Sequence, residues 1–86
     1  MKQNQKKDSH YKGNLKKDKR HGLWSSIKQG KKAWEGYYKD GERDGLWTWF
    51  NENGEKDWQG EFKDGKKVGK WTMWHDNGSI WHEVNY

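Results

Sequence analysis

Residues 45–65 read GLWTWFNENGEKDWQGEFKDG, and this stretch decides the fold. Apolar and polar residues alternate on both sides of Asn53-Gly54, and Asp64-Gly65 closes the stretch. Alternation with a period of two is typical of β-strands. Asn-Gly and Asp-Gly favour two-residue hairpin turns, because both central residues of such turns need positive φ. The stretch therefore predicts short antiparallel strands joined by tight turns.

The same pattern recurs along the chain. Trp24, Trp47 and Trp71 each follow a glycine by two positions, and they are 23 and 24 residues apart. An internal period of this length indicates a repeat architecture. We divide the chain into a basic, disorder-prone tail at residues 1–8 and a β-repeat domain at 9–86, with a degenerate half-repeat at 9–21 and repeats at 22–44, 45–68 and 69–86. The predicted fold is all-β, a single twisted antiparallel β-meander of about seven strands.

Closure of the turns predicts the register of neighbouring strands. A two-residue turn at Asp40-Gly41 places Trp34 opposite Trp47. Applied to the other turns and positions, the same rule gives the pairs Tyr11–Trp24, Trp58–Trp71, Gly13–Gly22, Gly36–Gly45, Gly60–Gly69, Leu15–Arg20, Tyr38–Arg43, Phe62–Lys67, Trp47–Gly60 and Trp49–Trp58. All of these residues fall on one side of the sheet, because alternate positions of a strand share a face.

Two places depart from the period. The sequences around Gly30 and Gly78 are one residue shorter than the sequence around Gly54, so a bulge or a different turn is expected there. In the last unit, a degenerate Trp81 aligns with Trp58.

The predicted sheet has one aromatic face. Its glycines form a groove between a row of tryptophans and a second row of Leu15, Tyr38 and Phe62. A missing Cβ lets an indole lie flat against the backbone. Three cationic side chains are expected to cover the second row and donate cation–π contacts: Arg20, Arg43 and Lys67.

The repeat resembles the variant class of MORN (membrane occupation and recognition nexus) repeats. Their pattern is roughly G-x-W-x-x-W/Y-x-x-N-G, followed by aromatic-x-E/G-x-aromatic-K-D-G. Residues 45–65 follow it nearly throughout, and the resemblance covers about residues 11–86. It implies a structural or interaction module, since many bacterial members are antitoxin-like or immunity-like proteins and better-known MORN proteins are linked to membranes and scaffolding. This chain is unusually short for the family, and its last unit lacks the closing Lys-Asp-Gly turn.

The composition combines strong polarity with many aromatic residues. Hydrophobic residues make up 28% and charged residues 36%, which is typical of disordered chains, whereas eight Trp, four Tyr and two Phe indicate a packed structure. The net charge of +5 is concentrated in residues 1–20, which hold eight Lys and Arg against two Asp. The absence of Cys excludes disulfides and Cys-based zinc sites. The sequence shows no signal peptide and no apolar membrane span, so we expect a cytoplasmic location.

The residues predict no enzyme, cofactor or metal site. His75 and His82 flank one turn, but zinc needs further ligands and only Asp76 or Glu83 lie near. The aspartates occupy turn positions, where Asp suits the backbone geometry. The glycines are periodic, which explains them structurally, and no nucleophile–base set is present.

We therefore expect a non-catalytic protein-binding module: a small inhibitor or antitoxin-type protein that masks another macromolecule, such as an anti-defence inhibitor from a phage or mobile element. An aromatic face without a second layer needs a partner, and basic residues along the Lys-Asp-Gly edge steer an acidic one. The candidate partner-binding residues are Trp24, Trp34, Trp47, Trp49, Trp58, Trp71, Tyr38, Phe62, Lys16, Lys17, Arg20, Lys39, Arg43, Lys63, Lys66 and Lys67.

Two alternative functions remain, and the chain is also expected to self-associate. An anionic membrane would attract the basic N-terminus and exposed Trp, and single-stranded nucleic acid would stack on Trp while lysines follow its phosphates. A homodimer through the edge strands at 9–15 and 79–85, or through the aromatic face, is also expected.

Overall fold

The computed structural model describes residues 9–86, so the tail predicted at 1–8 lies outside the described residues. Seven strands follow one another along the chain: β1 (Ser9–Lys16), β2 (Lys19–Lys28), β3 (Lys31–Lys39), β4 (Glu42–Phe50), β5 (Lys56–Lys63), β6 (Lys66–Trp74) and β7 (Ile80–Asn85). The described part of the chain contains no helix, and so no helix that could cross a membrane.

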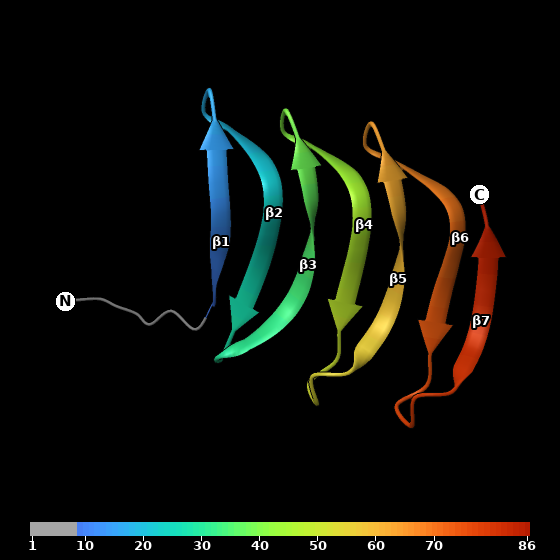
Figure 1. Ribbon diagram of the computed structural model, residues 1–86. Coiled ribbons are helices and arrows are strands. Elements are labelled where there is room, and N and C mark those ends of the chain that lie inside the picture. Colours follow the sequence, from blue (N-terminus) through green and yellow to red (C-terminus); the bar gives the residue numbers. More distant parts are fainter. Residues whose placement is uncertain (1–8) are drawn as a thin grey trace.

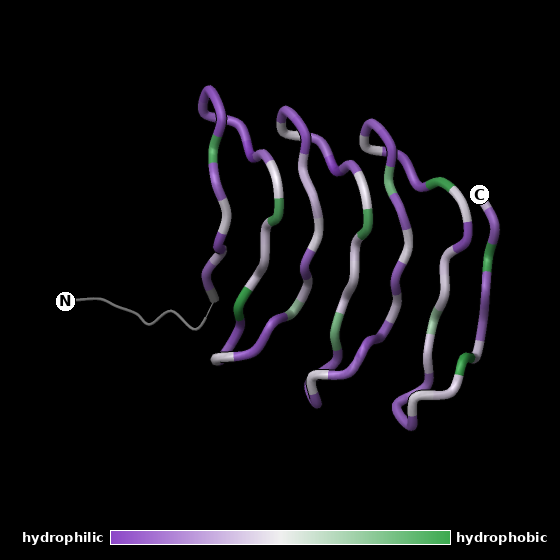
Figure 2. The backbone as a smooth tube through the Cα atoms, viewed as in Figure 1, coloured by the Kyte–Doolittle hydropathy of each residue, from purple (hydrophilic) through white to green (hydrophobic). Residues whose placement is uncertain are grey.

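The strands form one antiparallel sheet in the order β1 to β7, which confirms the predicted meander. Figure 1 shows a single curved layer, with no other described segment covering either side. The Cα atoms occupy 46 × 34 × 13 Å. Strongly hydrophobic positions are few and scattered, and the turns at both ends of the strands are hydrophilic (Figure 2). The core must therefore come from aromatic side chains packed within this one layer.

The Lys-Asp-Gly turns have the predicted two-residue geometry. Asp40 and Gly41 have φ of 51° and 88°, and Asp64 and Gly65 have φ of 51° and 84°. Both central residues are thus in the positive-φ region that primed turns require.

The prediction of such a turn at Asn53-Gly54 is wrong, because only the glycine has positive φ, and the same holds at Asn77-Gly78. Residues 51–55 form a longer loop, in which the side-chain oxygen of Asn51 accepts hydrogen bonds from the backbone N–H groups of Asn53 (2.9 Å) and Glu55 (3.1 Å). A side chain that satisfies loop donors stabilises a wider turn than the dipeptide alone predicts.

The turn at Gly30 differs from these loops, as expected, since Gln29 and Gly30 both have positive φ. The loop at Gly78 does not differ: His75 and Ser79 pair through the backbone as Asn51 and Glu55 do. The register shifts at this end of all three hairpins, so the bulge is a property of every repeat.

The predicted register is confirmed beside the Lys-Asp turns and between β4 and β5, and it is wrong farther along the hairpins that the Lys-Asp turns close. The confirmed pairs are Leu15–Arg20, Tyr38–Arg43, Phe62–Lys67, Trp47–Gly60 and Trp49–Trp58. The pairs Tyr11–Trp24, Trp34–Trp47, Trp58–Trp71 and Gly36–Gly45 are wrong, and Gly13–Gly22 and Gly60–Gly69 fall in irregular stretches without pairing. Instead, Trp34 lies opposite Trp49, and Gly36 lies opposite Trp47.

The physical cause is an irregularity in each even-numbered strand. Between the regular stretches of β3 and β4, Tyr37 alone faces residues 44–46. The glycine in this stretch, Gly45, has a φ of 107°, and its counterparts Gly22 and Gly69 have φ of 79° and 71°. Extra residues in one strand bend it and increase its twist. Because of this bend, the tryptophan that follows lies directly opposite a glycine of the preceding strand, as Trp47 lies opposite Gly36.

The alignment of the last unit is also wrong. His82, and not Trp81, lies opposite Met73, in the position that Trp58 occupies opposite Trp49. The missing residue after the turn shifts the strand by one position, and one position moves a side chain to the other face.

The positive φ of Gly69 predicts a graded response to substitution. Gly69→Ala should lower the free energy of unfolding by about 1 kcal/mol, because a Cβ disfavours this backbone conformation, whereas Gly69→Asn should cost less, since Asn tolerates it. No atom lies within 4 Å of the added Cβ, so packing does not confuse the comparison. Thermal unfolding followed by circular dichroism measures both; equal stability of the two variants would contradict the prediction.

Candidate partner-binding face

The aromatic face consists of three rows that run across the strands. The outer row is Tyr11, Ser26, Trp34, Trp49, Trp58, Met73 and His82. The central row is Trp24, Trp47 and Trp71, together with Gly13, Gly36 and Gly60. The cation row is Leu15, Arg20, Tyr38, Arg43, Phe62, Lys67 and Tyr86. Trp47, Trp58 and Trp71 thus share one face, as the sequence predicts.

Each central tryptophan lies on a glycine of the preceding strand. A Cβ built on Gly36 would meet the ring of Trp47 at 2.0 Å, so only glycine leaves room for the indole. The indole N–H of Trp47 donates to the backbone oxygen of Tyr37 at 2.8 Å. On either side of Gly36, Trp34 stacks on the indole (centroids 4.9 Å apart) and Tyr38 meets it edge-on (5.1 Å). We call this arrangement an indole socket.

The socket occurs three times, with the tryptophan always 11 residues after its glycine. Trp24 lies on Gly13 and donates to the oxygen of Asn14 at 2.8 Å, and Trp71 lies on Gly60 and donates to the oxygen of Glu61 at 3.2 Å. The exposed fractions of Trp24, Trp47 and Trp71 are 8%, 0% and 1%. These three predicted partner-binding residues therefore form the core of the face.

The outer row is more accessible, and it presents ring edges. Trp49 and Trp58 are stacked face to face, with centroids 3.8 Å apart and an interplanar angle of 3°. Both are half-buried, as is Trp34. Within residues 9–86, the indole N–H groups of these three tryptophans have no protein acceptor, and none of them is buried. They are donors that a bound molecule can use.

One cation per repeat covers each socket, which confirms the expected cation–π contacts. The charged groups of Arg20, Arg43 and Lys67 lie 4.6, 4.7 and 5.1 Å from the ring centroids of Trp24, Trp47 and Trp71. Arg20 also donates to the Tyr38 hydroxyl at 3.1 Å. A guanidinium held over a ring by such contacts keeps further N–H groups at its edge for hydrogen bonds.

The remaining predicted residues occupy two places. The rings of Tyr38 and Phe62 belong to the sockets, where they meet Trp47 and Trp71 edge-on. The other lysines lie exposed at the turn edge, at the top of Figure 1: Lys16, Lys17, Lys39, Lys63 and Lys66. Backbone bonds from Gly41 N to Arg20 O (2.9 Å) and from Gly65 N to Arg43 O (2.8 Å) connect the second and third turns to the preceding repeat. The edge is therefore regular, but it is separate from the rings.

The reverse face has a different, mixed character, as the sequence predicts for the side that carries Leu23 and Leu46 among Ser, Thr, Glu and Gln. A polar row crosses it in register: Ser25, Glu35, Thr48, Gln59, Thr72 and Glu83. Gln59 Nε2 donates to Thr48 Oγ1 at 2.7 Å. Beside this row, Leu23, Tyr37 and Leu46 are 45–46% exposed.

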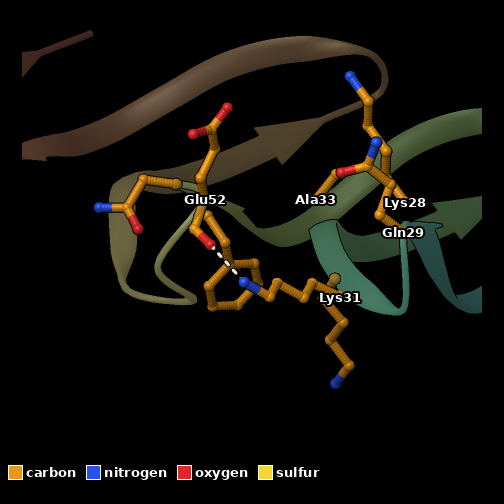
Figure 3. Close-up of a pocket in the computed structure, with 8 residues that line it drawn as sticks. Lys28, Gln29, Lys31, Ala33 and Glu52 are labelled. Carbon is orange, nitrogen blue, oxygen red and sulfur yellow. Dashed lines mark hydrogen bonds between the residues drawn. The ribbon is translucent and has the colours of Figure 1, made fainter.

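A shallow pocket of about 370 Å³ lies between the turn at Gly30 and the loop at 51–55. Figure 3 shows Lys31 reaching across it to the backbone oxygen of Glu52, at 3.0 Å, while Lys28 points away. Lys32 is paired with Glu35. The lysines around the pocket diverge, so they do not form an anion site. Among the described residues, no three His, Asp or Glu side chains gather as metal ligands.

The close approach in the sockets predicts the effect of adding one methyl group. Gly60→Ala should lower the free energy of unfolding by about 3 kcal/mol, because the new Cβ collides with the Trp71 ring. The near-UV circular dichroism of the stacked indoles should change with it. Gly54→Ala is the matched control: it meets no atom within 4 Å and should cost only about 1 kcal/mol for its positive φ, with an unchanged near-UV spectrum. Similar losses and spectra for both variants would contradict the socket.

Comparisons of this chain with protein-family models, with curated proteins and with solved structures found no match.

Proposed function

We propose that this protein is a non-catalytic protein-binding module that masks a partner with its aromatic face, in the manner of a small inhibitor or antitoxin. The observation that carries the proposal is the combination of half-buried tryptophans and regularly spaced cations on one rigid surface. Trp, Tyr and Arg are the residues enriched in binding hot spots. The variant MORN-repeat resemblance, which we also propose as the family, points to the same class of protein.

Preorganisation supports this function. The sockets hold Trp24, Trp47 and Trp71 through packing and through hydrogen bonds to the backbone, so the face does not have to be ordered when a partner binds. Rigid side chains lose little conformational entropy on association. The sheet is 46 × 34 Å in its two longer dimensions, which leaves room for an interface of the usual ~800 Å² per partner.

Charge reversal on the two faces tests the proposal. Arg43→Glu should abolish capture of the stoichiometric partner by the tagged protein in lysate of its own cells, because it puts a carboxylate on the aromatic face. Lys12→Glu makes the same charge change on the reverse face, where Lys12 lies beside Ser25, and should leave capture intact. Quantitative mass spectrometry compares the two variants with the unchanged chain. Loss with both variants, or with neither, would refute the aromatic face as the binding surface.

Self-association is a second proposal, supported by the sheet's edges. β1 and β7 lie at the edges of the described sheet, and Ile80 and Trp81 of β7 are more than half exposed. Unpaired edge strands with few charges pair readily with other strands. Light scattering should therefore show a mass that rises with concentration toward a dimer; a monomer mass at all concentrations would exclude this pairing.

A further inference from the structure

We infer that the aromatic face binds carboxylates at regular intervals. Its partner is an extended acidic segment that lies across the strands and has an acidic residue at every third position. The inference rests on the proposed function of this face and specifies the chemistry of its partner.

The cations of the face are regularly placed and lack partners. In the cation row, each of these side chains lies opposite one apolar or aromatic residue of its own repeat: Arg20 opposite Leu15, Arg43 opposite Tyr38, and Lys67 opposite Phe62. Within residues 9–86, none of the three forms a salt bridge, and the two salt bridges in this range use Glu35 and Glu83 of the reverse face. The positive charge of the aromatic face is thus uncompensated by the described part of the chain.

The surroundings of the cations favour carboxylates as ligands. A guanidinium that lies flat on a ring still offers N–H groups at its edge, in the fork that matches a carboxylate. Beside Arg43, which lies 5.7 Å from the Trp49 ring centroid, the outer row adds accessible indole N–H donors. Aromatic ring edges are the positive part of the ring quadrupole, and stacked rings such as Trp49 and Trp58 present edges outward. Cations, N–H groups and ring edges all attract negative oxygen atoms.

The same packing argues against single-stranded nucleic acid. Base recognition without sequence preference needs free ring faces on which bases stack. Here each of these rings already has one face occupied: Trp49 and Trp58 are stacked on each other, Trp34 is stacked on Trp47, and Arg43 lies over the Trp47 ring. An acidic polypeptide needs only the donors and edges that remain accessible.

The distance between successive cations indicates which backbone conformation the bound acidic segment has. Successive cations lie two strands apart, which is about 9.5 Å at the usual strand separation. A polyproline II helix rises about 3.1 Å per residue with three residues per turn, so every third side chain shares a face and recurs at about 9.3 Å. In a β-strand every third side chain alternates between faces. An acidic segment with polyproline II geometry therefore brings one carboxylate to each of Arg20, Arg43 and Lys67.

Synthetic peptides test the spacing directly. The probe is a dye-labelled peptide of four Glu-Pro-Ala units, and its control has the same composition with the four Glu in one block. Fluorescence anisotropy at low ionic strength should show about tenfold tighter binding of the periodic peptide. Arg43→Gln and Lys67→Gln should each weaken binding about fivefold, whereas Lys12→Gln on the reverse face should have no effect. Near-UV circular dichroism verifies that each variant keeps the sockets.

The possible outcomes separate the inference from the proposed function. Equal affinity for the two peptides, or no loss with Arg43→Gln, would overturn the periodic reading, and tighter binding of an oligothymidylate at the same ionic strength would replace it with nucleic-acid binding. If the cellular partner still depends on Arg43 while the peptides do not discriminate, the protein-binding function stands and the spacing inference fails. If neither depends on Arg43, both fail.

Discussion

The contact between an indole ring and the Cα of a glycine is the constraint on which the rest of this structure depends. In each repeat a tryptophan lies so close to the neighbouring strand that a single methyl group on the glycine would overlap the ring. This approach brings the indole N–H within reach of the next backbone oxygen, as Trp47 and Tyr37 show. A large apolar ring is thereby buried and its one polar group is satisfied, which is the requirement for placing Trp in a core.

This contact explains how a single layer can have a core. A sheet normally buries its apolar face against a second layer, and none covers the described strands. Here the indoles lie down within the face: Trp47 is enclosed by Gly36 beneath it, by Trp34 and Tyr38 at its sides, and by Arg43 above. The tryptophans of the outer row are only half-buried, so they are the part of this face that a partner can reach.

The cations link stability to recognition. Arg43 contributes to the cover of its socket, yet no carboxylate of the described residues neutralises it. A side chain that is both held by rings and free to bind acids is preorganised for an acidic partner. On the polar reverse face, Glu35 and Glu83 are paired to lysines, and Lys56 lies over the ring of Trp74. The two faces of one thin sheet therefore differ in charge as well as in composition.

The sequence by itself determined the all-β repeat fold, the shared face of six of the eight tryptophans and the position of one cation per repeat, because strand periodicity and Asp-Gly turns act over a few residues. It also contained the constant 11-residue spacing between glycine and tryptophan, a signal for the sockets. Only the tertiary structure decided the register beyond Tyr37, where the bend at Gly45 moves Trp47 from Trp34 to Gly36. Turn rules assume regular pairing, and nothing local to the turn reveals extra residues farther along the strand. For the same reason, the sequence does not show that Trp47 is buried more deeply than Trp49. This difference arises only when neighbouring strands bring their rings together.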